Sequence, residues 1–428
     1  MIGELAGLLR NRGFEWEIYW EKGRSDSFSI ERESVERGQR SFFSGIGLRI
    51  GINGRTGFSY VTGLNHGREE LENLVKRAVK LAKVGEIPFK GFPEVRKPAR
   101  VKGLYDRRIE EMPFEEAYSL ANGLSERMRE LKGRNQTLSG GLNLSVVHRG
   151  VVNSNGIELS SWETLLAVSS YAVEMNGGSG SGYEWNSYRD LGALREADAI
   201  VKRSVELAGD SHRGKETEPY EGELLLCPEA FGSVLSILLE NLRGDAVYHG
   251  NSRFFGPGET VGSELVTILD DATIPGAPGS YPFDGEGVPG QRTGLVTEGK
   301  LKSLLLDHTY ASLLGMESTG NGLRTFRDTP VIGTSNIEVL PEKDDIEGFE
   351  GVAVCRLFGE HTANPVSGDF SLTVELAYGR GVGGDPMKGG MFVGNVFELL
   401  KGIKGIGKRT VRKGSFKAPP VLVEGRLL

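Results

Sequence analysis

Glycine is the sequence feature that most constrains the fold of this chain. There are 62 glycines among 428 residues, with no collagen-like period and no confinement to low-complexity tracts. They instead punctuate short runs of β-branched and aromatic residues. Because glycine readily adopts the backbone conformations of tight turns and bulges, this pattern predicts a β-rich protein with many turns.

In the first half of the chain, segments with apolar residues at helical spacing flank two similar groups of expected strands. Residues 1–85 are expected to form a helix, four short strands and a second helix at Glu69–Lys83, where apolar residues recur at helical spacing. Residues 105–210 repeat this order between helices at Pro113–Leu131 and Leu191–Ala208. The expected strands are Glu15–Trp20, Asp26–Glu33, Ile46–Ile52, Thr56–Val61, Leu138–His148, Gly150–Asn155, Ile157–Glu174 and Gly182–Tyr188.

The predicted fold class is α+β, with an α/β N-terminal half that is a candidate for internal duplication and a β-rich C-terminal domain. A proline-rich linker at Ile87–Arg100 and a polar stretch at Gly209–Pro219 suggest the boundaries. We expect one α/β unit with its linker over residues 1–100, a second over 101–212, and the β-rich domain over 213–428. Helices in that last domain are expected at Glu229–Leu242, Thr309–Leu314 and Asn395–Ile403.

Composition limits the cellular location and the binding partners expected for this chain. No window approaches eighteen consecutive apolar residues, and Glu4 interrupts an N-terminal stretch that lacks a preceding basic region, so neither a membrane span nor a secretory signal is expected. The net charge of −7 does not favour direct nucleic-acid binding. Two cysteines far apart in sequence, Cys227 and Cys355, are expected to be buried free thiols in the reducing cytoplasm. Scarce glutamine beside plentiful Glu, Lys and Arg is typical of thermophiles.

Motifs that carry chemistry are missing when the residues are considered alone. None of the six histidines lies at helical spacing from another, so no His pair indicates a metal site. The segment Gly402–Thr410 nearly matches a phosphate-binding loop, but Arg409 occupies the required Ser or Thr position. No serine stands in a G-x-S-x-G frame, and the paired carboxylates are equally well explained by surface turns. We therefore expect no catalytic residue and no metal ligand in this chain.

Several linked motifs in the second half nevertheless resemble one protein family. Residues 269–324 contain Phe283-Asp-Gly-Glu-Gly287, a Gly299-Lys-Leu301 turn and Ser318-Thr-Gly-Asn321. A second set, Asn364-Pro-Val-Ser-Gly-Asp-Phe-Ser371, precedes the Gly-Asn segment at Val393–Val396. These features and the N-terminal GIGLRIGINGRTGFSY are similar to the TldD/PmbA family of intracellular peptidase subunits.

The resemblance points to the branch of the family without a metal site. TldD-like members are similar to zinc metallopeptidases that carry a His-Glu-x-x-x-His helix and a cysteine ligand near the C-terminus. The matching helix here, Glu229–Leu242, has no histidine, and the matching C-terminal segment is Lys408–Lys413. The resemblance therefore implies a TldE/PmbA-like subunit with no cofactor of its own. The resemblance further implies a heterodimer with a TldD-like partner, which would hold the zinc that cleaves peptides. The alternative is a homodimer of this chain.

Such a subunit would shape the cleft that holds the peptide. The residues expected to line that cleft are Asp284, Glu286, His308, Asn321, Asn364 and Asp369, and hydrogen bonds within turns are an equally good explanation for them. Two other functions stay open. One is a stand-alone metallopeptidase or hydrolase that uses His249, His308 or His361, and the other is a non-enzymatic modulator of DNA gyrase that binds another protein.

Overall fold

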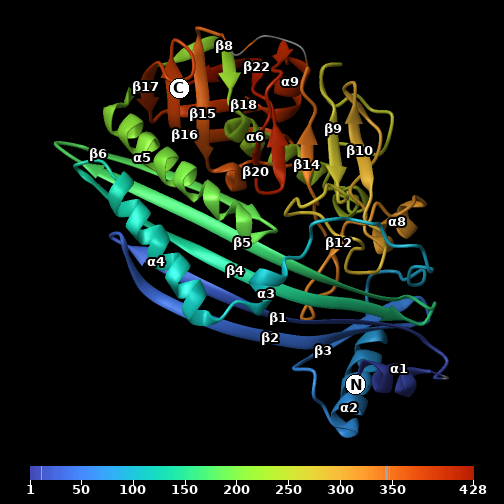
Figure 1. The fold of residues 1–428 in the computed structure, drawn as a ribbon. Helices are drawn as coiled ribbons and strands as arrows, with labels where there is room; N and C mark the ends of the chain where they lie inside the picture. Colours follow the sequence, from blue (N-terminus) through green and yellow to red (C-terminus); the bar gives the residue numbers. More distant parts are fainter. Residues whose placement is uncertain (11, 343–345, 347) are drawn as a thin grey trace.

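A single antiparallel sheet of long strands forms the N-terminal half. The computed structural model describes residues 1–10, 12–342, 346 and 348–428. The sheet order is β3-β2-β1-β4-β5-β6, so β1 and β4 pair at the centre. The strands are β1 Glu15–Glu31, β2 Ser34–Ile52, β3 Arg55–Thr62, β4 Gln136–Asn153, β5 Glu158–Met175 and β6 Ser179–Tyr188. The two groups of strands expected from the sequence are thus joined edge to edge in one sheet (Figure 1).

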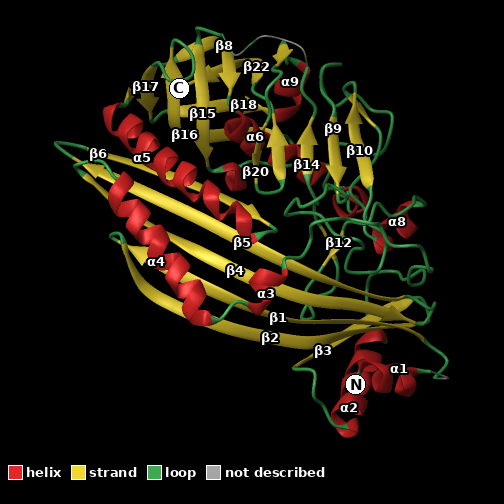
Figure 2. Ribbon diagram, viewed as in Figure 1, coloured by secondary structure: helices red, strands yellow, loops and turns green. Residues whose placement is uncertain are grey.

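Helices cover the two ends of this sheet. The helices are α1 Ile2–Leu9, α2 Arg68–Ala82, α3 Arg107–Glu111, α4 Phe114–Leu131, the 3₁₀ helix η1 Leu191–Glu196 and α5 Ala197–Arg213. Trp16 and Ile18 of β1 pack with α1 and α2, whereas Phe28 and Ile30 of the same strand pack with α4 and α5. Because side chains alternate along a strand, these even-numbered residues share one face of the sheet. Figures 1 and 2 show the two helix groups at opposite ends.

The predicted helices are confirmed to within a few residues, but two predicted breaks between strands are wrong. The expected strands Glu15–Trp20 and Asp26–Glu33 are parts of one continuous strand, β1, which ends at Glu31. Likewise, Leu138–His148 and Gly150–Asn155 are parts of β4, which ends at Asn153. Glycine misled the prediction, because Gly23 and Gly150 are strand residues beside bulky neighbours. A Cβ atom on Gly23 would lie 2.4 Å from Phe43 Cζ and 2.6 Å from the Val146 carbonyl oxygen.

The C-terminal half is β-rich and contains two larger sheets (Figure 2). In the eight-stranded sheet, five strands lie side by side in the order β15-β8-β22-β18-β16. Because β15 also pairs with β16, these five strands form a closed ring. That sheet comprises β7 Lys215–Glu216, β8 Tyr220–Leu226, β15 Val352–Phe358, β16 Asp369–Gly379, β17 Asp385–Lys388, β18 Met391–Asn395, β19 Gly405–Ile406 and β22 Val421–Leu427.

The second sheet has the order β11-β10-β9-β14-β21-β20. Its strands are β9 Ile268–Asp271, β10 Arg292–Thr297, β11 Lys300–Leu301, β14 Ile337–Val339, β20 Val411–Lys413 and β21 Phe416–Ala418, and a separate pair is β12 Gly322–Leu323 with β13 Val331–Ile332. The helices of this half are α6 Pro228–Asn241, α7 Gly244–Tyr248, α8 His308–Leu314, η2 Glu360–Thr362 and α9 Val396–Lys401. One large apolar core spans both sheets, and the whole chain is α+β. Within the described residues, no helix is both long and apolar enough to cross a membrane.

The expectation of two free thiols is wrong, because the structure joins Cys227 and Cys355 in a disulfide. Strands β8 and β15 are parallel neighbours, and their last registered pair is Leu226 with Val354. Cys227 directly follows the last residue of β8, and Cys355 is the next residue of β15, so the two Cα atoms lie 4.6 Å apart, within the range that a disulfide spans. A sequence separation of 128 residues concealed this proximity.

Candidate functional site where helix α6 begins

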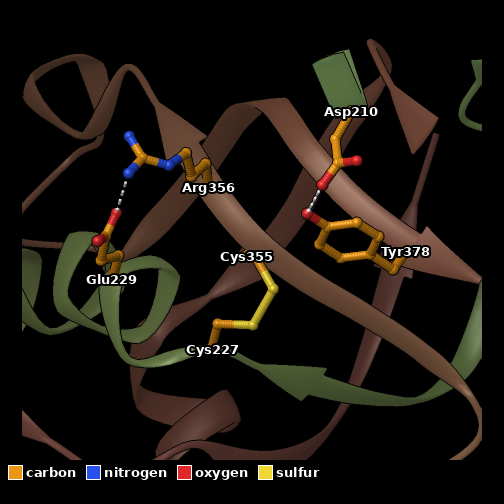
Figure 3. Close-up of a disulfide and its surroundings, with 6 residues drawn as sticks. All are labelled: Asp210, Cys227, Glu229, Cys355, Arg356 and Tyr378. Carbon is orange, nitrogen blue, oxygen red and sulfur yellow. Dashed lines mark hydrogen bonds and ion pairs between the residues drawn. A yellow bond between two sulfur atoms is a disulfide. The ribbon is translucent and has the colours of Figure 1, made fainter. Parts of the chain in front are cut away.

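A cavity of about 460 Å³ lies where the N-terminal sheet meets the C-terminal half. Its walls come from β6, α5, the start of α6, and strands β15 and β20. Among the side chains that line it are Glu184, Trp185, Arg203, Glu229, Arg356 and Lys413. The wall formed by α5 is tied to β16, because the Tyr378 hydroxyl donates a 2.6 Å hydrogen bond to Asp210 (Figure 3).

Local sequence explains why α6 begins at this cavity. The apolar end of β8, Leu224–Leu226, is buried, and Pro228 then occupies the first turn of the helix, where its missing N–H costs nothing. Glu229 follows in that first turn, where a negative charge is favoured by the helix dipole. The rest of α6 is anchored by buried residues such as Phe231 and Leu235.

A β-bulge places two consecutive residues of β15 on the cavity. In the pairing with β16, Val354 faces Ala377 and Arg356 faces Leu376, so Cys355 is an extra residue. Side chains normally alternate between the two faces of a strand, and a bulge redirects them. As a result, both Cys355 and Arg356 line the cavity.

Four charged side chains of the cavity form a closed ring of ion pairs, which we call the charge ring. Arg356 lies 3.1 Å from Glu184 and 3.0 Å from Glu229, and Lys413 lies 2.6 Å from each of the same two carboxylates. Each member is at most 33% exposed, so water screens these pairs less than it screens surface pairs. Glu184 comes from the N-terminal sheet, so the ring also bridges the two halves.

The donor atoms of this cavity do not fit a zinc ion. Zinc sites use thiolate, imidazole and carboxylate ligands. Here the two sulfurs are bonded to each other, and both carboxylates of the charge ring are paired with Lys413 and Arg356, which are not zinc ligands. Across the part of the chain that the structure describes, no group of three or more His, Cys, Asp or Glu residues could hold a metal ion.

Four of the residues predicted from the sequence lie instead in the interior between the two halves. Asp284 Oδ1 accepts hydrogen bonds from the amides of Glu286 and Val288, and its Oδ2 accepts one from the Gly322 amide. Glu286 accepts from Arg49 and from the His308 amide, each at 2.7 Å. Asn321 donates to Asp270 at 2.9 Å. Asp284, Glu286 and Asn321 are at most 1% exposed, so as placed they hold loops and do not face solvent.

A buried ion network joins these loops to the N-terminal sheet. Arg49 of β2 lies 2.9 Å from Glu17 of β1 and 2.7 Å from Glu286, and Arg324 also pairs with Glu17. Burial and the nearby Glu286 carboxylate raise the pKa of Asp284 to about 8. Burial opposes ionisation of Glu286, but Arg49 and His308 keep its pKa below the ordinary value. A group of charges that satisfy one another in this way is costly to break at any single member.

The other two predicted residues lie elsewhere, Asn364 in the turn before β16 and Asp369 at the first position of that strand. Asn364 Oδ1 accepts from the amides of Val366 and Ser367, and Asp369 accepts from the Asn395 side chain at 2.8 Å. Both side chains are exposed. The structure therefore brings four of the six predicted residues into one region and places two in another.

His249, His308 and His361 each contact a different partner. His249 Nε2 is 3.2 Å from the Tyr310 hydroxyl, and His308 Nε2 is 3.1 Å from the Gly91 carbonyl oxygen. The His361 ring packs near Phe358. Each histidine has a local partner, so this arrangement gives no support to a hydrolytic site built from the three.

Sequence reasoning missed the charge ring as a site. A signal was present, because the resemblance to the family places the segment Lys408–Lys413 and the helix Glu229–Leu242 where other members carry metal ligands. The structure brings these two segments to one cavity, with Lys413 Nζ 2.6 Å from Glu229. Glu184 comes from the other half of the chain and had no local sequence signal.

Comparisons with known proteins define the class. Three family models match successive parts of the chain: PmbA/TldA metallopeptidase domain 1 over residues 16–82, the central domain over 107–211, and the C-terminal domain over 220–426. The fold and these matches define a metallopeptidase-like protein. The chain belongs to the PmbA/TldD family.

Relatives span almost its whole length. An uncharacterized protein of Methanocaldococcus jannaschii, MJ0231, is 30% identical over 100% of this chain and 99% of its own. The Metalloprotease TldD homolog of Haemophilus influenzae is 25% identical over 92% and 86% of the two chains. TldE from Thermococcus kodakarensis has a similar fold, with a TM-score of 0.83, 23% identity and 96% of each chain covered. A Thermotoga maritima protein described as a candidate modulator of a DNA gyrase matches with a TM-score of 0.88, 23% identity, and 100% and 98% coverage.

Proposed function

We propose that this chain is the TldE/PmbA-like, non-catalytic subunit of a TldD/TldE-type zinc metallopeptidase that acts on peptides in the cytoplasm. The observation that carries the proposal is the charge ring. The two segments that resemble metal-binding segments of the family meet at one cavity through the ion pair of Glu229 with Lys413, and Arg356 of β15 pairs with the same carboxylate. Because lysine and arginine are not zinc ligands, the residues at this position stabilise the contact between the two segments and do not hold zinc.

In this proposal the zinc and the hydrolytic step belong to a TldD-like partner, and this chain supplies part of the wall around the peptide. The exposed residues Asn364 and Asp369 are available for contact with an extended peptide. Asp284, Glu286 and Asn321 would act on the cleft only through the loops that they hold, and His308 through its contact with the linker at Gly91. A peptide substrate and no nucleic acid are proposed, in keeping with the net charge of −7.

Metal content and peptide hydrolysis test the proposal directly. The purified chain would be assayed alone, then mixed with a TldD-like protein from the same cell, with unfolded casein and short peptides as substrates. We expect hydrolysis only in the mixture, with zinc in the partner and a complex of the two chains on size-exclusion chromatography. Stoichiometric zinc and chelator-sensitive hydrolysis by this chain alone would overturn the proposal.

The variants Lys413→Met and Asn364→Ala sharpen this experiment. Lys413→Met removes a cation of the charge ring but restores no zinc ligand, so it should leave the isolated chain inactive and without metal. Asn364→Ala should raise the KM of the complex for peptides if that surface contacts substrate. A matched exposed change, Asn251→Ala, lies in the loop after α7 and serves as the control.

A further inference from the structure

The disulfide between Cys227 and Cys355 forms part of the wall of the cavity at the start of α6. Both cysteines line the cavity, although they are only 9% and 6% exposed in the whole molecule. Figure 3 shows the bond between β8 and β15, beside the ion pair of Glu229 and Arg356. The cavity therefore offers a route to the bond, while the opposite sides of the two cysteines pack in a small apolar cluster with Leu225, Ala353 and Leu376.

The backbone around the disulfide does not depend on the bond. The Cys227 amide donates a 2.9 Å hydrogen bond to the Val354 carbonyl oxygen, and β8 and β15 are paired over three residues before it. On the other side, β15 is paired with β16, and β8 with β22. Because these ladders hold both strands, cleavage of the sulfur–sulfur bond leaves the two cysteines close together.

The two sulfurs stand in different surroundings. Cys227 is the N-cap residue of the 14-residue helix α6, where free backbone amides and the helix dipole favour a negative charge. Cys355 is the extra residue of the bulge in β15. In thiol–disulfide exchange, the sulfur that forms the better-stabilised thiolate is the better leaving group.

We propose that this disulfide is a thiol–disulfide exchange site for small-molecule thiols that enter through the cavity. The thiolate of an external thiol attacks Cys355 Sγ, the sulfur–sulfur bond breaks, and its electron pair leaves on Cys227 Sγ. A second external thiolate then attacks the external sulfur of the mixed disulfide and releases the Cys355 thiolate. Two external thiols are thereby oxidised to their disulfide, and the protein disulfide is reduced to two thiols.

The size of the cavity selects the class of reductant. A volume of about 460 Å³ lies in the range of pockets that hold small molecules, whereas a reductase domain would have to approach the bond over an exposed surface. The proposal thus commits to a thiol of small-molecule size. It goes beyond the proposed function and does not depend on it, because the reaction requires neither a partner subunit nor a peptide.

The dependence of the reduction rate on urea tests the route of attack. The purified chain would be treated with 2-mercaptoethanol at several concentrations of urea below the unfolding transition, and free thiols would be trapped by alkylation and counted by mass spectrometry. Exchange through the cavity predicts a rate that is first order in thiolate and varies less than about twofold with urea. A rate that rises exponentially with urea, or no reduction until the chain unfolds, would show a structural disulfide and overturn the proposal.

Two single-cysteine variants test the roles of the sulfurs. With iodoacetamide at pH 7, the thiol of Cys227 in Cys355→Ser should react about threefold or more faster than the thiol of Cys355 in Cys227→Ser, because the helix terminus favours its thiolate. Equal rates, or a faster reaction at Cys355, would contradict the assigned leaving group. If either variant fails to fold, the same comparison can be made on the reduced native chain by mapping which cysteine is alkylated first.

Discussion

At the scale of single residues, buried carboxylates make the stability of the protein depend on pH. Asp270 is 1% exposed, and burial raises its pKa to about 6, although Asn321 and Ser335 donate hydrogen bonds to it. The folded state therefore holds this proton more tightly than the unfolded state does. The stabilisation is complete below about pH 4 and is lost as the pH rises through about 6.

Asp270→Asn removes this titration and so isolates it. We expect the free energy of unfolding of the native chain, measured relative to Asp270→Asn, to fall by about 2–3 kcal/mol between pH 4 and pH 7. Urea unfolding at intervals of half a pH unit measures the difference. Ser335→Ala removes a hydrogen bond that favours the charged form, so it should steepen the fall. A difference that does not change with pH would contradict the assignment.

At the scale of elements, glycines set how closely helices approach the N-terminal sheet. A Cβ atom on Gly182 of β6 would lie 2.3 Å from the Ser204 carbonyl oxygen of α5, and one on Gly57 of β3 would lie 2.1 Å from the Ala78 carbonyl oxygen of α2. We expect Gly182→Ala to destabilise the chain by about 1–3 kcal/mol, because a rigid helix backbone must move. Gly123→Ala in α4 meets no atom within 4 Å and should instead stabilise slightly. Urea unfolding compares the two, and equal effects would contradict this packing role.

The same glycines explain how much of the fold could be predicted. Helices such as Arg68–Ala82 were predictable because their buried residues recur at helical spacing, a local signal. Gly23 and Gly150 were wrongly interpreted as breaks between strands, because the aromatic rings that need their space come from elsewhere in the sheet. The disulfide and the charge ring depend on strand neighbours that are distant in sequence, so no local pattern could indicate them. The motif that contains Asp284 and Glu286 was visible in the sequence. The burial of these two side chains was not, because the residues that cover them are distant in sequence.

At the scale of the whole molecule, charged residues tie the N-terminal sheet to the C-terminal half at several places. Arg49 and Arg324 join Glu17 to the loops around Glu286, and the charge ring joins Glu184 to Arg356 and Lys413. Arg189 of the first half also donates to the carbonyl oxygens of Ala277 and Ser280. These links predict that the two halves unfold together in one cooperative transition.

Tryptophan fluorescence can test this cooperativity, because the four tryptophans at positions 16, 20, 162 and 185 all lie in the N-terminal sheet. Trp185 also lines the cavity between the halves, so fluorescence should report the sheet and that junction, whereas far-UV circular dichroism reports both halves. In urea the two probes should give coincident transitions for the native chain. Arg49→Met leaves Glu17 and Glu286 without one buried partner and should cost about 3–5 kcal/mol, whereas Arg68→Met, in an exposed pair with Glu72, should cost less than about 1 kcal/mol. Separate transitions in the native chain, or equal costs for the two variants, would show that the buried network does not couple the halves.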